Sequence, residues 1–225
     1  MSVALPRPVW WPQALQHLGE VAPVFVEIDR LATAAAWRAP GDAFTSLARA
    51  IVGQQISVKA ASSVWQRLLT AVDPDGAGLL SPPAVLQLAA PDLRACGLSE
   101  RKAEYVQALA RHFSAPDFSA AALAQRDNAE VVAELTAIRG IGAWTAEMYL
   151  MFHLQRPDVL PVADLGVRAG AGSLFGQGGP MGAAELRRLA APWTPFASAA
   201  SWLLWRYLEY DPELRQQVRS VVASA

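Results

Sequence analysis

The residues with the clearest chemical potential lie in the stretch 135–153, Leu-Thr-Ala-Ile-Arg-Gly-Ile-Gly followed by Ala-Trp-Thr-Ala-Glu-Met-Tyr-Leu-Met-Phe-His. Gly140 and Gly142 predict a tight turn between two segments of helical periodicity, because glycine allows backbone angles and close approaches that side chains forbid. The first N–H groups of the second helix would point outward, where they and the helix dipole can hold a phosphate, and the Thr145 hydroxyl could add a donor. The alternative is an ordinary corner between two helices.

A second candidate is Asp164, which lies in the otherwise apolar run Pro-Val-Ala-Asp-Leu-Gly-Val at 161–167. A buried, unpaired carboxylate is costly, so Asp164 is expected to be paired, to cap a helix, or to be functional. We expect it to cap a helix over 165–174, and capping and function are compatible. With the glycine turn, this suggests a protein that grips a nucleic-acid backbone and acts on it with an acid group.

Composition limits the class of protein. The chain has 225 residues, 53% of them hydrophobic, and a net charge of −1. We expect a cytoplasmic protein, because no apolar run reaches the ~20 residues of a membrane span and the N-terminus lacks the pattern of a signal peptide. Cys96 is the single cysteine, which excludes an internal disulfide. The charge argues mildly against nucleic acid, although a local basic patch is compatible with it.

The elements that position these residues are predicted to be helices. Apolar residues recur at helical spacing, no strand-like run stands out, and we expect an all-α fold of about ten helices. Helix starts are predicted at Ser81, Ser99, Asp127 and Asp211. We expect two helical lobes with a DNA-binding cleft between them. One would span about 42–165, with the hairpin at 135–153, and the other about 1–41 plus 166–225.

The motifs resemble those of the helix-hairpin-helix DNA glycosylases. The resemblance rests on two motifs, Ile-x-Gly-Ile-Gly-x-Trp-Thr-Ala at 138–146 and Leu-Pro-Val-Ala-Asp-Leu-Gly-Val at 160–167. Within that superfamily the chain resembles the 3-methyladenine DNA glycosylase II group, which excises alkylated bases. The resemblance includes 51–61, similar to that group's DNA-inserting loop, and Trp193-x-Pro through Trp205. It covers most of the chain, from about Asp42 to Tyr210.

The resemblance implies roles at the reaction centre. Asp164 would stabilise an oxocarbenium-like sugar and position or activate the attacking water. Trp144 stands where bifunctional relatives carry a lysine, so no lyase activity is expected. Trp144, Tyr149 and Trp205 are candidates for the wall of a pocket that holds a cationic base against aromatic rings. For Tyr149 a place in the core is an equal alternative.

The resemblance also implies how DNA is held while a base is flipped out of the duplex. Gln55 would fill the gap and Gln54 would contact the opposite strand, although both could belong to an ordinary polar loop. The remaining DNA contacts are expected at Ser57, which also caps a helix, and at Lys59, Lys102, Arg139, Gly140, Gly142 and Thr145. Backbone carbonyls of Ile138 and Ile141 would hold a structural Na⁺ or K⁺. No cofactor is required, and an iron–sulfur cluster would need four cysteines.

The predicted activity is that of a monofunctional DNA glycosylase in base excision repair. It would release 3-methyladenine and 7-methylguanine from double-stranded DNA. Family members often carry arginine where this chain has Ala197, and the longest have an additional N-terminal domain, so 1-methyladenine or 3-methylcytosine could also be substrates. We expect a cytoplasmic, nucleoid-associated monomer. The alternatives are a mismatch or uracil glycosylase, a non-catalytic hairpin DNA-binding protein, and an all-α protein with no nucleic-acid role.

Overall fold

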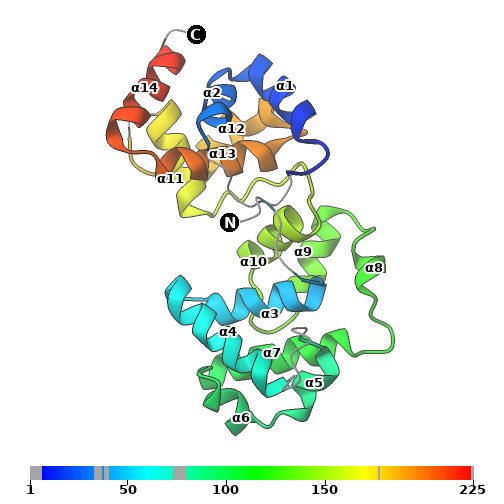
Figure 1. The fold of residues 1–225 in the computed structure, drawn as a ribbon. Helices are drawn as coiled ribbons and strands as arrows, with labels where there is room; N and C mark the ends of the chain where they lie inside the picture. Colours follow the sequence, from blue (N-terminus) through cyan, green and yellow to red (C-terminus); the bar gives the residue numbers. More distant parts are fainter. Residues whose placement is uncertain (1–6, 33–36, 38–40, 73–79, 177, 224–225) are drawn as a thin grey trace. The chain divides into compact units, whose positions relative to one another are not determined.

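The computed structural model describes residues 7–32, 37, 41–72, 80–176 and 178–223. These residues contain helices and no strand, which confirms the all-α fold (Figure 1). They form two compact units. We call the described residues of 39–154 the central unit and those of 1–38 and 155–225 the terminal unit. None of the described helices is long and apolar enough to cross a membrane.

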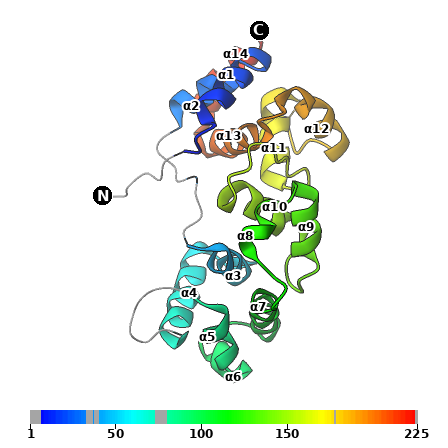
Figure 2. The same cartoon turned by 90° about the vertical axis from the view of Figure 1, so that its right-hand side faces the viewer.

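The central unit carries the predicted hairpin. Its core is formed where α3 packs on α4 and α7, and α5 and α6 pack on the other parts of α7. Figure 2 shows α9 beside α10, the two helices that flank the glycine turn. The elements are α3 (Ala43–Gly53), α4 (Val58–Val72), α5 (Pro82–Gln87), α6 (Ala90–Ala95), α7 (Glu100–Phe113), α8 (Ala120–Leu123), α9 (Asn128–Thr136), α10 (Ala143–Met148) and the π-helical segment η1 (Tyr149–His153).

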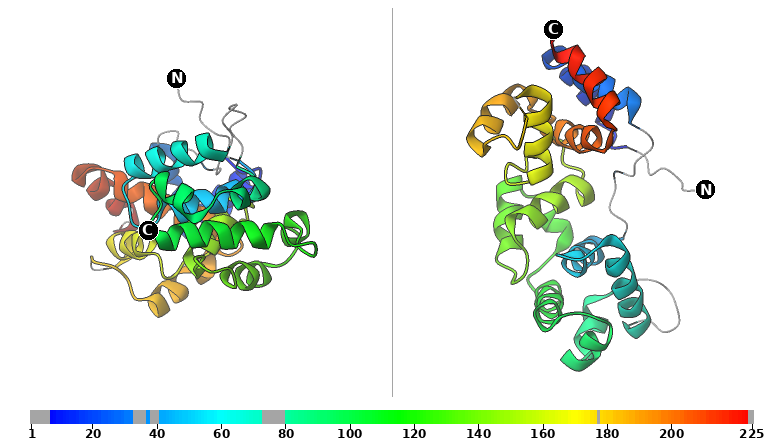
Figure 3. Two further views of the ribbon diagram at one scale, coloured as in Figure 1. Left: turned by 90° about the horizontal axis from the view of Figure 1, so that it is seen from below. Right: turned by 90° about the vertical axis from the view of Figure 1, so that its left-hand side faces the viewer.

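The terminal unit carries Asp164. Its centre is α13, which packs against α11, α1 and α2, while α14 packs on α2 (Figure 3). The elements are α1 (Trp11–Val21), α2 (Val24–Leu31), α11 (Leu165–Phe175), α12 (Ala183–Ala190), the 3₁₀ turn η2 (Ala191–Trp193), α13 (Ala197–Glu209) and α14 (Pro212–Ala223). Most of α13 is buried, so its buried residues, which are apolar except for Ser198 and Ser201, surround the helix rather than form one stripe.

The predicted helix starts are confirmed by their caps. Ser81 and Ser99 accept hydrogen bonds from backbone N–H groups three residues later, and Asp127 forms a capping box with Glu130. Such caps satisfy N–H groups that the first helical turn leaves without partners. The described residues form fourteen α-helices rather than about ten. Short helices such as the four-residue α8 have too few turns to give a periodic pattern.

Candidate functional site

Asp164 is the N-cap of α11, as the sequence predicts. Its Oδ1 accepts a hydrogen bond of 2.7 Å from the backbone N–H of Val167. The same oxygen accepts a second bond, of 2.8 Å, from the indole Nε1 of Trp205 on α13. The side chain is half-buried. Two N–H donors therefore converge on one carboxylate oxygen and fix the orientation of the group at the positive end of α11.

Gly166 makes room for this arrangement, and sequence reasoning missed it. A Cβ at residue 166 would lie 2.8 Å from both Cδ1 and Nε1 of Trp205, and 3.1 Å from Oδ1 of Asp164. Any side chain there would push the indole away from the carboxylate. No local signal could reveal this, because Trp205 reaches Gly166 only through the packing of α13 on α11.

The turn between α9 and α10 depends on one of its two glycines. Gly140 has φ +98°, and a Cβ on it would collide with the ring of Tyr105. Gly142 is the N-cap of α10 with φ −94° and ψ 170°, angles open to any residue. A Cβ on Gly142 would meet no atom of the described residues within 4 Å. The fold therefore requires glycine at 140 but not at 142, where the backbone is open to a ligand.

The loop after α3 is tied to this turn. Gln54 donates a 3.0 Å hydrogen bond from Nε2 to the carbonyl of Gly140. The ammonium of Lys102 donates to the carbonyls of Val52 and Gln54, at 2.8 and 2.6 Å, and burial lowers the pKa of Lys102. Both side chains, predicted to contact DNA, thus support the loop in this structure. Gln55 has φ +57° and its side chain is exposed. Of the two glutamines, Gln55 is therefore the one that lies at the surface of the loop.

The other predicted DNA contacts differ in accessibility. Ser57 accepts a 3.2 Å hydrogen bond from the N–H of Ala60, so its predicted capping role is confirmed. Lys59 is exposed. Arg139 is largely exposed and forms a 2.8 Å ion pair with Glu104. Thr145 is buried, so it does not offer its hydroxyl at the surface beside the turn as predicted, because it faces the interior of the central unit.

Of the three candidate aromatic residues, two are accessible. Trp144, in the first turn of α10, is 48% exposed. Trp205 is half-buried beside Asp164, in the terminal unit. Tyr149 is buried and lines a cavity of about 130 Å³ with Ser46, Leu47, Ala50, Thr145, Met148 and Phe152. Burial raises the pKa of Tyr149 to about 12, and the structure favours the core alternative for it.

Two further predicted positions are buried. Ile138 and Ile141 are each 5% exposed, and the Ile138 carbonyl accepts a 3.1 Å hydrogen bond from the N–H of Ile141. Ala197, the first residue of α13, is also buried, and its N–H donates a 3.1 Å hydrogen bond to Oδ1 of Asp158. An arginine at 197 would not fit this site without rearrangement, which agrees with the small residue found there.

Comparisons with known proteins cover most of the chain. Residues 48–195 match the family model described as HhH-GPD superfamily base excision DNA repair protein. DNA-3-methyladenine glycosylase 1 of Schizosaccharomyces pombe is 32% identical over 164 residues, which are 72% of this chain and 71% of that protein. The matched range of the family model contains Gln54, the glycine turn and Asp164, whereas Trp205 lies beyond its last residue.

Solved structures agree with this match. The crystal structure of DNA-3-methyladenine glycosidase from Bacillus halodurans is 31% identical, with a TM-score of 0.80, and covers 92% of this chain and 93% of its own. The 3-methyladenine DNA glycosylase Mag1 of S. pombe, in complex with abasic DNA, is 27% identical with a TM-score of 0.69. That alignment covers 88% of this chain and 97% of Mag1.

Proposed function

Because this chain belongs to the HhH-GPD superfamily of base excision DNA repair proteins, we propose that it is a monofunctional 3-methyladenine DNA glycosylase in which Asp164 is the catalytic carboxylate. The observation that carries the proposal is the fixed carboxylate itself. The backbone N–H of Val167 and the indole of Trp205 hold one oxygen of a half-buried group at the start of α11. The matching family, and relatives named for this activity, supply the substrate class.

The reaction is the hydrolysis of an N-glycosidic bond. The base leaves with the bonding electron pair, and positive charge develops on the sugar at C1′. The Asp164 carboxylate would stabilise that charge, and a water molecule would then attack C1′ and pass its proton to the carboxylate. A base that carries a methyl group and a positive charge leaves as a neutral molecule. Good leaving groups of this kind need little further activation, so 3-methyladenine and 7-methylguanine are the proposed substrates, with 1-methyladenine and 3-methylcytosine as further candidates.

Trp144 is proposed to contact the flipped base. Its half-exposed indole can stack on a cationic purine, an interaction worth roughly 0.5–2 kcal/mol. It also stands where bifunctional relatives carry an amine, and an indole cannot form a Schiff base. We therefore expect base release without strand cleavage.

The proposed DNA contacts begin at the glycine turn and the neighbouring loop. The open backbone at Gly142 would accept a phosphate, and exposed Gln55 would fill the space that the flipped base leaves. Lys59 and Arg139 are accessible for further phosphate contacts. A Na⁺ or K⁺ ion at the Ile138 and Ile141 carbonyls stays a proposal; the Ile138 carbonyl, which accepts one hydrogen bond, retains a second lone pair for a cation.

A panel of defined lesions tests this function. Purified protein is incubated with duplexes that carry 3-methyladenine, 7-methylguanine, uracil or a mismatch, and released bases and strand breaks are measured separately. We expect release of the methylated purines and intact abasic strands. Release of uracil or a mismatched base alone would favour the other glycosylase activities of this fold, and no release from any duplex would favour a DNA-binding protein without catalysis.

A further inference from the structure

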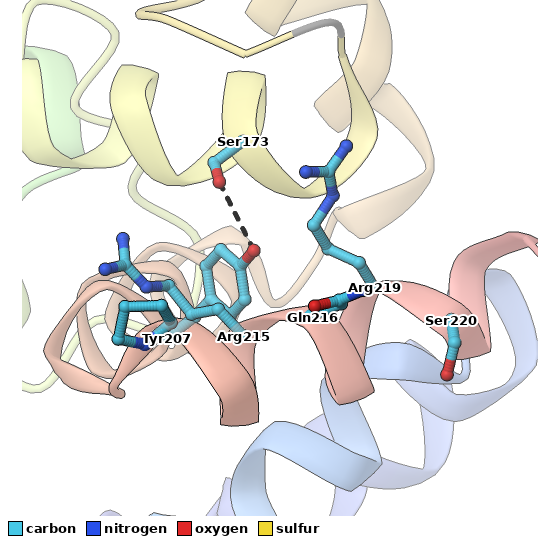
Figure 4. Close-up of a pocket in the computed structure, with 7 residues that line it drawn as sticks. Ser173, Tyr207, Arg215, Gln216, Arg219 and Ser220 are labelled. Atoms are coloured by element: carbon cyan, nitrogen blue, oxygen red, sulfur yellow. Dashed lines mark hydrogen bonds between the residues drawn. The ribbon is translucent and has the colours of Figure 1, made fainter.

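The terminal unit contains a basic cavity that the proposed reaction does not use. It has a volume of about 630 Å³ and lies between α11, α13 and α14 (Figure 4). Its lining is formed by Ser173, Tyr207, Pro212, Arg215, Gln216, Arg219 and Ser220. Ser173 lies nine residues after Asp164, which corresponds to a rise of about 13 Å along α11. The cavity is therefore separate from the candidate catalytic group.

Two arginines of α14 give the cavity its charge. Arg215 and Arg219 lie one helical turn apart. Figure 4 shows the Arg219 side chain extending towards α11 and the Arg215 side chain extending past the Tyr207 ring, so that their guanidinium groups lie on either side of the Ser173–Tyr207 pair. Neither forms an ion pair with a carboxylate in the described part of the chain, unlike Arg206, which pairs with Glu209 at 2.7 Å. Like charges at this spacing repel each other, so an anion bound in the cavity would relieve their repulsion.

The atoms between the arginines are suited to the same anion. The hydroxyl oxygens of Ser173 and Tyr207 lie 3.2 Å apart, so one hydroxyl donates to the other. The accepting hydroxyl keeps a proton that it can donate into the cavity. The Nε of Arg215 is shielded from solvent and has no hydrogen-bond partner among the described residues. The buried Tyr207 ring holds its hydroxyl in place.

We propose that this cavity binds a phosphate group. Two guanidinium groups, a hydroxyl and the Gln216 amide provide several donors around one space, and guanidinium forks match the oxygens of a phosphate. The phosphate could belong to a small ion in solution or to the backbone of a DNA strand. The site itself is independent of the proposed glycosylase function, and only its use by DNA depends on that function.

The first part of the test uses inorganic phosphate. Titrations at constant ionic strength, followed by calorimetry and by the NMR signals of the arginine Nε–H groups, compare three proteins. These are the wild type, the variant R215Q/R219Q, and the control R187Q/R188Q, which removes the same charge from exposed positions on α12. We expect phosphate to bind the site variant at least 10-fold more weakly than the other two. Ser173→Ala, which removes only a hydroxyl, should weaken binding by a smaller factor.

The second part distinguishes the two sources of phosphate. If a DNA strand occupies the cavity, R215Q/R219Q lowers duplex affinity and reduces the slope of log affinity against log salt by about 1–2, whereas the control does not. If the source is a free ion, the duplex affinity and slope match those of the control while phosphate binding is lost. Either result supports the site. Equal phosphate affinity in all three proteins, or signal changes away from Arg215 and Arg219, would overturn it.

Discussion

At the residue scale, the proposed chemistry depends on the Asp164 carboxylate and on the N–H groups that hold one of its oxygens. Asp164 serves both as helix cap and as catalytic candidate, because the Val167 N–H and the Trp205 indole leave it fixed on the accessible start of α11. The sequence predicted the cap, since Asp before an apolar helical run is a local signal. It predicted Trp205 only as part of an aromatic pocket wall. The hydrogen bond from its indole depends on the packing of two helices separated in sequence.

The hydrogen bond from Trp205 can be tested by removing its donor. Trp205→Phe keeps an aromatic ring but no N–H, so Oδ1 of the carboxylate loses the indole hydrogen bond and keeps the one from Val167. We expect base release to slow by about 10-fold, the equivalent of about 1.4 kcal/mol, with duplex affinity within about twofold of the wild type. Single-turnover rates with saturating enzyme measure this. A normal rate would show that the indole contributes nothing through the hydrogen bond.

Gly166 should act through the same hydrogen bond. Gly166→Ala places a Cβ 2.8 Å from Nε1 of Trp205, so the indole must move and base release should slow to a similar extent. The double variant G166A/W205F is the discriminating measurement, since residues that act through one contact are not additive. We expect it to be no slower than the worse single variant. Losses that multiply would assign Gly166 a role independent of Trp205.

At the scale of elements, two hydrogen-bonded connections organise the candidate DNA-binding surface of the central unit. Gln54 joins the loop after α3 to the glycine turn, and Lys102 holds the same loop from α7. The sequence placed both glycines in a turn and both glutamines in a loop. It could not show that the side chains of Gln54 and Lys102 bind the protein's own backbone, because those hydrogen bonds join segments up to 86 residues apart.

Substitutions at the two glycines of the turn are expected to have different effects, one on stability and the other on DNA affinity. Gly140→Ala puts a Cβ at φ +98° and against Tyr105, which should destabilise the fold by about 1–3 kcal/mol. Gly142→Val suits φ −94° and ψ 170°, so thermal stability should be unchanged while duplex affinity falls. Thermal melts and binding titrations of both variants separate these effects. Wild-type affinity for Gly142→Val would show that the turn is only structural.

Gln55 offers a variant in which stability and activity should change in opposite directions. A non-glycine residue at φ +57° is strained, so Gln55→Gly should leave the fold unchanged or stabilise it by up to about 1 kcal/mol. Without the side chain, a flipped base is no longer replaced in the stack, and base release from duplex DNA should slow. Release from single-stranded DNA serves as control and should change little. Equal rates of Gln55→Gly and the wild type on duplex DNA would show that the Gln55 side chain does not fill the gap left by the flipped base.

At the scale of the whole molecule, stability is distributed over the cores of two units. The all-α fold and several helix starts were predictable, because periodicity and caps are local signals. The burial of Thr145 was not predicted, and for Tyr149 a core position was only one of two alternatives. Helix α10 is only six residues long before η1 begins, so its inward face depends on packing against α9 and on the cavity that both residues share with α3.

Two tyrosines, one in each unit, make the contribution of a buried hydroxyl measurable. The Tyr149 hydroxyl has no hydrogen-bond partner in the described part of the chain, whereas Tyr210 donates a 2.7 Å bond to the carbonyl of Ile28. Tyr149→Phe should therefore be neutral or stabilising at pH 7, and Tyr210→Phe should cost about 1 kcal/mol. Denaturant unfolding of the two variants measures the difference. A larger loss for Tyr149→Phe would indicate that its hydroxyl is satisfied by water in the cavity.

The same tyrosines predict how stability depends on alkaline pH. Burial raises the pKa of each to about 12 from an ordinary value of 10.0. The folded protein therefore holds more protons than the unfolded chain between pH 10 and 12, and its stability should fall as the pH rises through this window. Each Tyr→Phe variant should lose less stability than the wild type over this pH range. An unchanged slope in both variants would contradict the raised pKa values.

The measurement that tests the central claim most directly is base release by Asp164→Asn. Asparagine can still accept hydrogen bonds from Val167 and Trp205 through its amide oxygen, so α11 keeps its cap while the negative charge is lost. We predict a melting temperature close to that of the wild type, unchanged affinity for a methylated duplex, and release of 3-methyladenine slowed by about 10²–10³-fold. Release at the wild-type rate from this folded variant would contradict the assignment of Asp164 as the catalytic carboxylate.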